Sequence, residues 1–264
     1  MFLPTLHRST VITIAVLLST AAWAQDQGRE FHWRGKLATD QLLTIKNING
    51  DIDANASDAG EVQVTAVKSG PNADQIRIEV VPGSEGVTIC AVYPGDSDNC
   101  GSDNHHYGTS SHGNNGKVHF TVQMPKNLRL EADNVNGNVN ADGMGREVRA
   151  NSVNGNVDLS TTSWAEAKTV NGRIKAAMGD AGWNGTLQIE SVNGSIELDM
   201  PGDFNADVNF SSVNGHIDSD FPLTVNNSWP VGHSAKGTVG KGGRELAIKT
   251  VNGSVELRKG SAGI

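Results

Sequence analysis

Three histidines have the residue type and proximity of a metal site. His105, His106 and His112 lie in the polar segment 99–116, and imidazole nitrogens bind Zn²⁺, Cu²⁺ or Ni²⁺. The segment consists mainly of Asn, Gly, Ser and His and has no strand or helix periodicity that would fix a coordination geometry. We interpret it as a polar surface loop. We expect no bound metal and no cofactor, with these histidines only as weak candidates.

Carboxylates that recur at one position of a repeated sequence are the other residues that could do chemistry. Glycosidases use paired carboxylates about 5 to 9.5 Å apart, but stacked repeats would supply such distances whatever the function. The sequence contains no nucleophile elbow, phosphate loop or His-Glu-x-x-His pattern. We predict a protein that is not an enzyme and keep a carbohydrate-active β-helix enzyme as the alternative.

The same row of residues could instead bind Ca²⁺ or a basic partner. Neighbouring carboxylates repel by only about 1 kcal/mol in water, so a hydrated row needs no metal. Its members lie three residues after each glycine of a repeated Asn-Gly pair: Asp53, Asn140, Asp158, Lys175, Glu197, Asp218 and Glu256.

The N-terminus predicts export. Arg8, an apolar run from Val11 to Leu18, and the small residues Ala22 and Ala24 form a secretory signal peptide over residues 1–24. We expect cleavage near Ala24 and a product that stays in the periplasm or is secreted to the cell surface, without membrane insertion. The two cysteines, Cys90 and Cys100, are expected to form a disulfide in that oxidising environment.

Charge limits the partners. Removal of residues 1–24 leaves 20 basic and 29 acidic side chains, a net charge of −9. An acidic surface repels phosphate backbones, so we expect no nucleic acid. Glycans and proteins of the cell envelope, including a second copy of the chain, remain as partners. A third hypothesis is a periplasmic metal-binding or stress accessory protein that uses the histidine loop.

The elements that position these residues are set by a repeat. The pentapeptide Val/Ile-Asn-Gly-x-Val/Ile occurs seven times, and from the second copy onward the glycines are 18, 17, 22, 21 and 38 residues apart. The last gap predicts one degenerate coil between Asp220 and Gly243. The repeated turn pairs are Asn49-Gly50, Asn136-Gly137, Asn154-Gly155, Asn171-Gly172, Asn193-Gly194, Asn214-Gly215 and Asn252-Gly253.

Alternating apolar residues on both sides of each turn predict β-strands, with glycine supplying positive φ at a sharp corner. A hairpin meander is the competing architecture, but it would bury the small polar residue three positions before each glycine and expose the valine two positions before it. We favour a solenoid whose chain bends earlier and buries that valine. Stacked coils also explain the constant asparagine, because amides about 4.8 Å apart can form a hydrogen-bonded ladder.

The predicted fold is therefore all-β, a single-stranded parallel β-solenoid with coils of about 17–22 residues. We expect irregular coils and a cap over residues 25–125, including strands at 62–67, 76–80, 87–92 and 118–124, and regular repeats over 126–264. Four tryptophans lie outside the repeated core positions and could stack on sugars or cover coil edges: Trp33, Trp164, Trp183 and Trp229.

With these residues in place, the chain resembles the "putative adhesin" family of exported bacterial β-strand-repeat proteins, a domain of unknown function. The resemblance rests on the repeats from Val135 to Val255, on the lead-in at 120–126 and on the closing segments at 221–223, 242–244 and 250–257. It covers residues 40–259. It implies a right-handed β-helix in the cell envelope with no catalytic residues, and hence an adhesin-like binding or structural surface.

Overall fold

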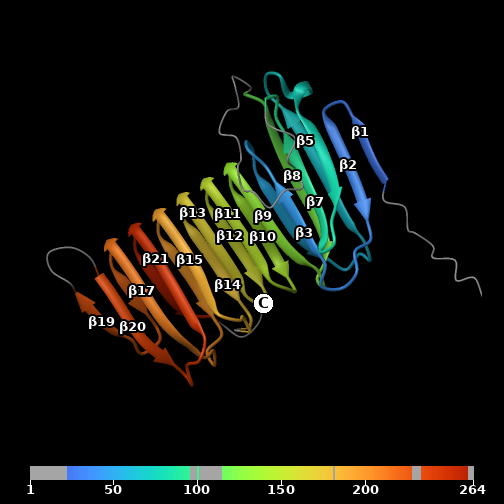
Figure 1. The fold of residues 1–264 in the computed structure, drawn as a ribbon. Helices are drawn as coiled ribbons and strands as arrows, with labels where there is room; N and C mark the ends of the chain where they lie inside the picture. Colours follow the sequence, from blue (N-terminus) through green and yellow to red (C-terminus); the bar gives the residue numbers. More distant parts are fainter. Residues whose placement is uncertain (1–22, 96–99, 101–114, 181, 228–232, 261–264) are drawn as a thin grey trace, which may run out of the picture.

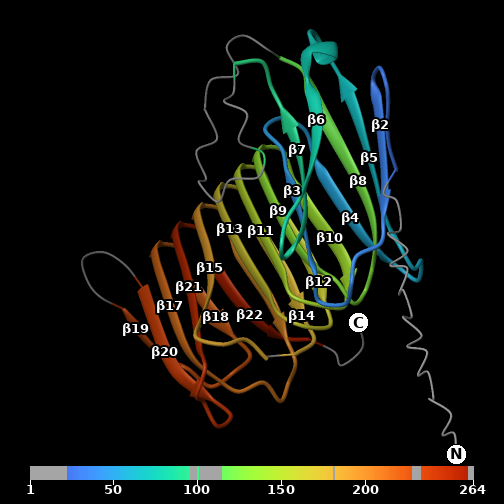
Figure 2. The same cartoon turned by 45° about the vertical axis from the view of Figure 1, so that its right-hand side comes forward.

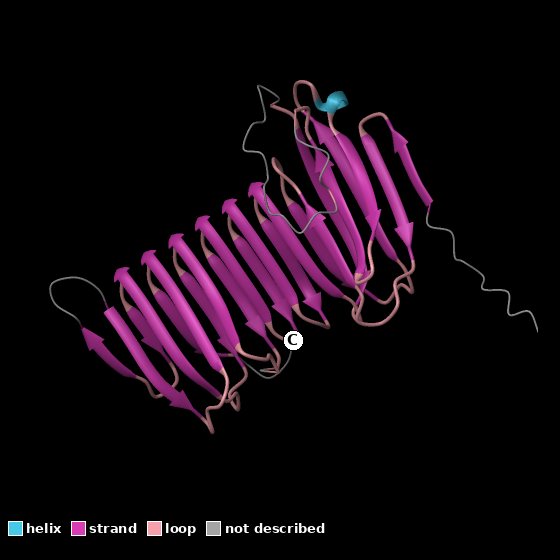
Figure 3. Ribbon diagram, viewed as in Figure 1, coloured by secondary structure: helices cyan, strands magenta, loops and turns pink. Residues whose placement is uncertain are grey.

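The computed structural model describes residues 23–95, 100, 115–180, 182–227 and 233–260. Most of the predicted signal peptide, the three loop histidines and Trp229 lie outside the described residues. The described chain is all-β apart from one short 3₁₀ helix, η1 (Ala73–Gln75). The strands form two sheets that run the length of the molecule (Figure 3).

Each sheet contains 11 strands. In spatial order the first sheet, sheet A, consists of β1 (Trp23–Gln27), β2 (Glu30–Gly35), β5 (Val62–Ser69), β8 (Lys117–Pro125), β4 (Ile52–Ser57), β10 (Val139–Met144), β12 (Val157–Thr161), β14 (Ile174–Met178), β16 (Ile196–Met200), β22 (Val255–Lys259) and β18 (Ile217–Ser219). Sheet B consists of β19 (Thr224–Asn227), β20 (His233–Val239), β17 (Ala206–Asn214), β21 (Glu245–Asn252), β15 (Thr186–Asn193), β13 (Ala165–Asn171), β11 (Val148–Asn154), β9 (Arg129–Asn136), β3 (Leu42–Lys46), β7 (Gly86–Val92) and β6 (Arg77–Pro82).

The repeats build a solenoid, as predicted. Each repeat gives one strand to sheet B, turns at Asn-Gly, and gives the next strand to sheet A, and successive repeats pair in parallel. The first copy, around Gly50, stacks directly on the second, since β3 pairs with β9 and β4 with β10 despite the long intervening segment. Figure 1 shows the resulting row of rungs from β3 to β17.

The ends of both sheets depart from the predicted single-stranded parallel helix. Strands β1, β2, β5 and β8 pair antiparallel at one end of sheet A, and β6 pairs antiparallel with β7 in sheet B. At the other end, β17, β20 and β19 are also antiparallel. The sheets are therefore mixed. The right-handed winding implied by the resemblance stays a prediction.

The expected degenerate coil between Asp220 and Gly243 is wrong. That segment contains the antiparallel strands β19 and β20, and the chain then returns so that β21 lies between β15 and β17 (Figure 2). The last repeat in sequence is thus the second-to-last rung in space. Its register with both neighbours is that of the other repeats, since Asn252 pairs with Asn193 on one side and with Asn214 on the other.

A carboxylate fastens this end of the solenoid. Asp207 of β17 accepts hydrogen bonds from the Thr238 hydroxyl at 2.8 Å and from the Gly243 N–H at 3.1 Å. The Thr238 bond and then the Gly243 bond favour the charged form, so they lower the pKa of Asp207 below its usual value.

The predicted orientation of the corner residues is wrong. The valines before asparagine are exposed, by between 37% and 41% for Val153, Val170, Val192, Val213 and Val251, whereas the small polar residues one position earlier are buried. Only the first copy, with Ile48 at 7%, buries this position as expected. The sheet B strands continue through the asparagine, so their alternation is preserved and the bend falls at Asn-Gly itself.

Hydrogen bonding explains why a small polar residue occupies the inner corner. The side chains of Ser152, Thr169 and Ser191 donate to the carbonyls of Gly137, Gly155 and Gly172 on the neighbouring coil, at 2.9 to 3.0 Å. Ser212, Thr250 and Asn134 do the same in their coils. A buried carbonyl without a donor would be costly, so valine cannot replace these residues.

The turn glycines are required by close stacking more than by positive φ. Only Gly50 and Gly137 of the seven have positive φ, at 111° and 153°. In the others a Cβ would lie about 2 Å from the carbonyl oxygen of the neighbouring turn glycine, for example 1.9 Å from that of Gly155 in the case of Gly172. Any side chain would push the coils apart.

Two further expectations concern the cysteines and the tryptophans. Cys90 and Cys100 form the disulfide. Trp33 and Trp183 are buried, and Trp164 packs against the core under the Arg149 guanidinium, 5.3 Å from the ring centroid. None of these three side chains therefore offers an open stacking platform for sugars.

Candidate binding surface

The exposed valines form one wall of a groove on the outer face of sheet B. The groove has a volume of about 770 Å³ and follows the solenoid axis across six strands, from β9 to β17. Its apolar wall, here called the valine row, consists in spatial order of Val135, Val153, Val170, Val192, Val251 and Val213.

The opposite wall consists of the outward residues four positions before each glycine. We call it the polar row; in the same order it contains Asp133, Asn151, Lys168, Glu190, Lys249 and Ser211. Lys168 and Glu190 are register neighbours, as are Glu190 and Lys249. Two cations and two anions alternate, so the wall carries no net charge.

The lysines of the polar row already form ion pairs within the chain, but the side chains of these pairs remain partly exposed. Lys249 contacts Glu190 at 3.2 Å, and Lys168 contacts Glu166 at 3.0 Å, with side-chain exposures between 25% and 57%. At the end of the row, Asp133 is only 4% exposed, and its Oδ1 accepts from Asn151 at 2.8 Å. Its Oδ2 has no hydrogen-bond partner among the described residues.

The asparagine ladder runs beside the valine row. Each amide nitrogen donates to the amide oxygen of the next coil, at 2.7 to 2.9 Å, from Asn214 through Asn252, Asn193, Asn171, Asn154 and Asn136 to Asn49. The ladder predicted from the constant asparagine is therefore present in all seven copies. It links the corners and makes the valine row a regular, rigid surface.

The side chains three positions after each glycine point outward, but several of their carboxylates contact basic side chains of the same chain. Asp158 contacts Arg173 at 3.3 Å, Glu197 contacts Lys175 at 3.3 Å, and Asp53 lies 3.3 Å from His119. Among the residues that the structure describes, no cluster of three or more His, Cys, Asp or Glu side chains could hold a metal ion. The row gives no support to a cation site.

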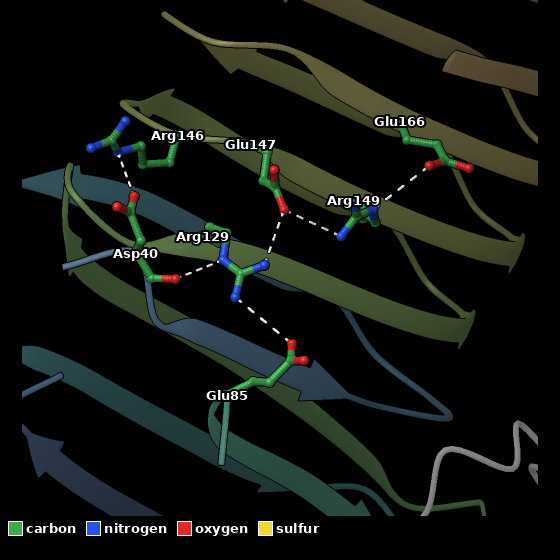
Figure 4. A network of polar contacts seen from close by, with 7 residues as sticks. All are labelled: Asp40, Glu85, Arg129, Arg146, Glu147, Arg149 and Glu166. Carbon is green, nitrogen blue, oxygen red and sulfur yellow. Dashed lines mark hydrogen bonds and ion pairs between the residues drawn. The ribbon is translucent and has the colours of Figure 1, made fainter. Parts of the chain in front are cut away.

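A network of charges covers sheet B beside the groove (Figure 4). Arg129 contacts Glu85 and Glu147, at 3.8 and 3.3 Å, and Arg149 contacts Glu147 and Glu166, at 3.3 and 3.7 Å. The network combines strand residues such as Arg149 with residues just before a strand, Glu85 and Glu147, and the local sequence gives no sign that they meet. Each of its charged groups contacts one of opposite sign, so the network links neighbouring coils.

No helix in the described part of the chain is long and apolar enough to cross a membrane.

The fold and this surface define a β-solenoid-like repeat protein. The sequence matches the family described as Toastrack DUF4097 over residues 36–258, and the chain belongs to that family. This confirms the resemblance stated from the sequence. No significant match was found among curated proteins.

Two solved structures are similar to the chain. One is a "putative cell adhesion protein" from Clostridium sporogenes, with 10% identity and a TM-score of 0.47, covering 86% of this chain and 98% of the other. The second is a "putative adhesin" from Bacteroides fragilis, with 11% identity and a TM-score of 0.32, covering 86% and 96%. At these scores the likenesses carry no functional argument.

Proposed function

We propose that this protein is a non-catalytic, exported β-repeat protein of the cell envelope that binds another macromolecule through the groove between the valine row and the polar row. The observation that carries the proposal is the row of valines, exposed at regular intervals on a rigid ladder. A solvent-exposed apolar strip of this regularity costs free energy in water, and such strips mark interaction sites.

The chemistry of the groove favours a protein partner over a glycan. Sugars are bound most often by stacking on aromatic rings, but Trp33 and Trp183 are buried and Trp164 lies under Arg149. The walls are aliphatic and of alternating charge. A partner must therefore offer apolar side chains next to matching charges, which is typical of protein surfaces.

Site-specific photo-crosslinking in cells tests this function. A photoreactive residue in place of Ser211, which lines the groove, should give adducts with a protein. The matched control is the same residue in place of Ser195, which is exposed but does not line the groove. Equal adducts from both positions, or none from Ser211, would contradict the proposal.

Export is tested separately by fractionating cells that produce the protein. We expect the mature chain in the periplasmic or surface fraction, with an N-terminus near Gln25 by mass spectrometry. A full-length chain retained in the cytoplasm would contradict the envelope assignment while leaving the groove intact.

A further inference from the structure

We infer that the partner of the groove is a second copy of this chain, packed face to face with its solenoid axis reversed. This inference rests on the proposed function and names the partner. The two copies would be related by a two-fold axis perpendicular to the solenoid axis, so that valine row meets valine row and polar row meets polar row.

The spacing of the exposed valines favours a second solenoid as the partner. The valines repeat at the spacing of paired strands, about 4.8 Å, over a row about 24 Å long. An α-helix repeats its contacts about every 5.4 Å and a strand about every 6.8 Å, so neither stays in step along the row. A second solenoid has the same period, so its valine row stays in step with the first along the whole length, as in dry sheet interfaces.

The order of charges in the polar row also favours a second copy in the reversed direction. When six positions are placed against the same six in reverse, Lys168 lies opposite Glu190 of the second copy, and Glu190 lies opposite Lys168. Lys249 then lies opposite an asparagine. The row is therefore self-complementary under the symmetry of a two-fold dimer, with the axis between β13 and β15.

The same order disfavours the nearest alternative registers. A slip of one coil in one direction places Lys168 opposite its own counterpart in the second copy. A slip in the other direction places Glu190 opposite its own counterpart. Like charges face each other in both cases, which is unfavourable at a desolvated interface. A slip of two coils can pair Glu190 with Lys249, but only full overlap keeps the whole valine row within the interface.

Analytical ultracentrifugation of the purified mature protein tests the dimer. Wild-type protein should show a concentration-dependent monomer–dimer equilibrium, and V192D, at the centre of the valine row, should shift it toward monomer by tenfold or more. The control S195D adds the same charge to the same coil outside the groove and should dimerise as wild type does. Circular dichroism of each variant establishes that it is folded.

Reversing the charges of Lys168 and Glu190 tests the register of the two copies with two independent variants. K168E alone and E190K alone each place like charges across the two-fold axis and should weaken self-association roughly tenfold. An equal mixture of the two variants should form heterodimers, because each restores the opposite charge that the other lacks. This rescue would not occur if the substitutions acted only on folding.

Two results would overturn the inference: wild-type protein that stays monomeric at every concentration, or a dimer that is weakened neither by V192D nor by the single charge reversals K168E and E190K. If Ser211 crosslinks in cells to a different protein while the purified chain is monomeric, the proposed function stands and the second copy is the wrong partner. If neither position crosslinks, the groove itself is not a binding site.

Discussion

At the scale of single residues, the inner corner depends on one side-chain donor per coil, a hydroxyl in the coils after Asn134. Ser191 is buried and donates to the Gly172 carbonyl at 3.0 Å. S191A should lower the free energy of unfolding by about 1 to 2 kcal/mol, because that carbonyl then lacks a donor. S191T should be close to neutral, since Thr169 and Thr250 make the same bond in their coils. Denaturant unfolding measures both, and an S191A as stable as wild type would contradict this account.

Glycine at the turn is tested by a pair of alanine substitutions. In G172A the new Cβ would lie 1.9 Å from the Gly155 carbonyl oxygen, so we expect a loss of at least about 2 kcal/mol. A Cβ added at Gly202 would meet nothing within 4 Å, and the φ of Gly202 is not positive, so G202A should leave the melting temperature almost unchanged. Similar losses in both variants would show that close stacking is not the reason for the glycine.

At the scale of elements, the asparagine ladder couples successive coils through neutral side chains. Asn171 donates to Asn154 and accepts from Asn193, whereas Asn214 at the end of the ladder only donates, to Asn252. N171A should therefore destabilise the protein about twice as much as N214A, roughly 1 to 2 kcal/mol against half of that. Unfolding curves for the two variants, measured side by side, decide this. Equal losses would mean that the ladder bonds contribute little.

At the scale of the whole molecule, the order of coils in space differs from their order in the chain. Because β21 and β22 lie between earlier strands, a chain that ends at residue 243 loses an inner rung, including the buried Leu246, Ile248 and Val255. Hydrogen exchange should then show lost protection in β15, β16 and β17 while β9 to β13 stay protected. A truncated chain with full protection in β17 would mean that β17 can pair with β15 directly.

The mixed ends have a role at this scale too. A solenoid exposes open strand edges at both ends, and such edges invite uncontrolled pairing with other chains. Antiparallel strands lie at one end of sheet A, with β2 and β5 beside β8, and at both ends of sheet B, with β6 beside β7 and with β19 and β20 beside β17. The other end of sheet A is the short parallel strand β18. Short and antiparallel edges of this kind disfavour end-to-end stacking of solenoids, so lateral contact through the groove fits a closed dimer better than a fibre.

Local sequence was sufficient for much of this fold. Period-two alternation and the seven Asn-Gly pairs predicted the strands, the coil length, the parallel stacking and the ladder of Asn49 to Asn252, because these features depend on neighbouring residues and on repetition. The disulfide between Cys90 and Cys100 followed from the cysteine count and the predicted export.

The tertiary structure alone decided which way the corner residues face. Inward and outward assignments reverse if the bend moves by one residue, and the bend position depends on the carbonyls that Ser191 and its equivalents must satisfy across coils. It also decided where the last repeat sits, because a repeat identical in pattern to its neighbours carries no local sign of its place. The first decision exposes the valine row, and the second places Val251 between Val192 and Val213 within it. Both depend on contacts between coils, which the tertiary structure alone defines.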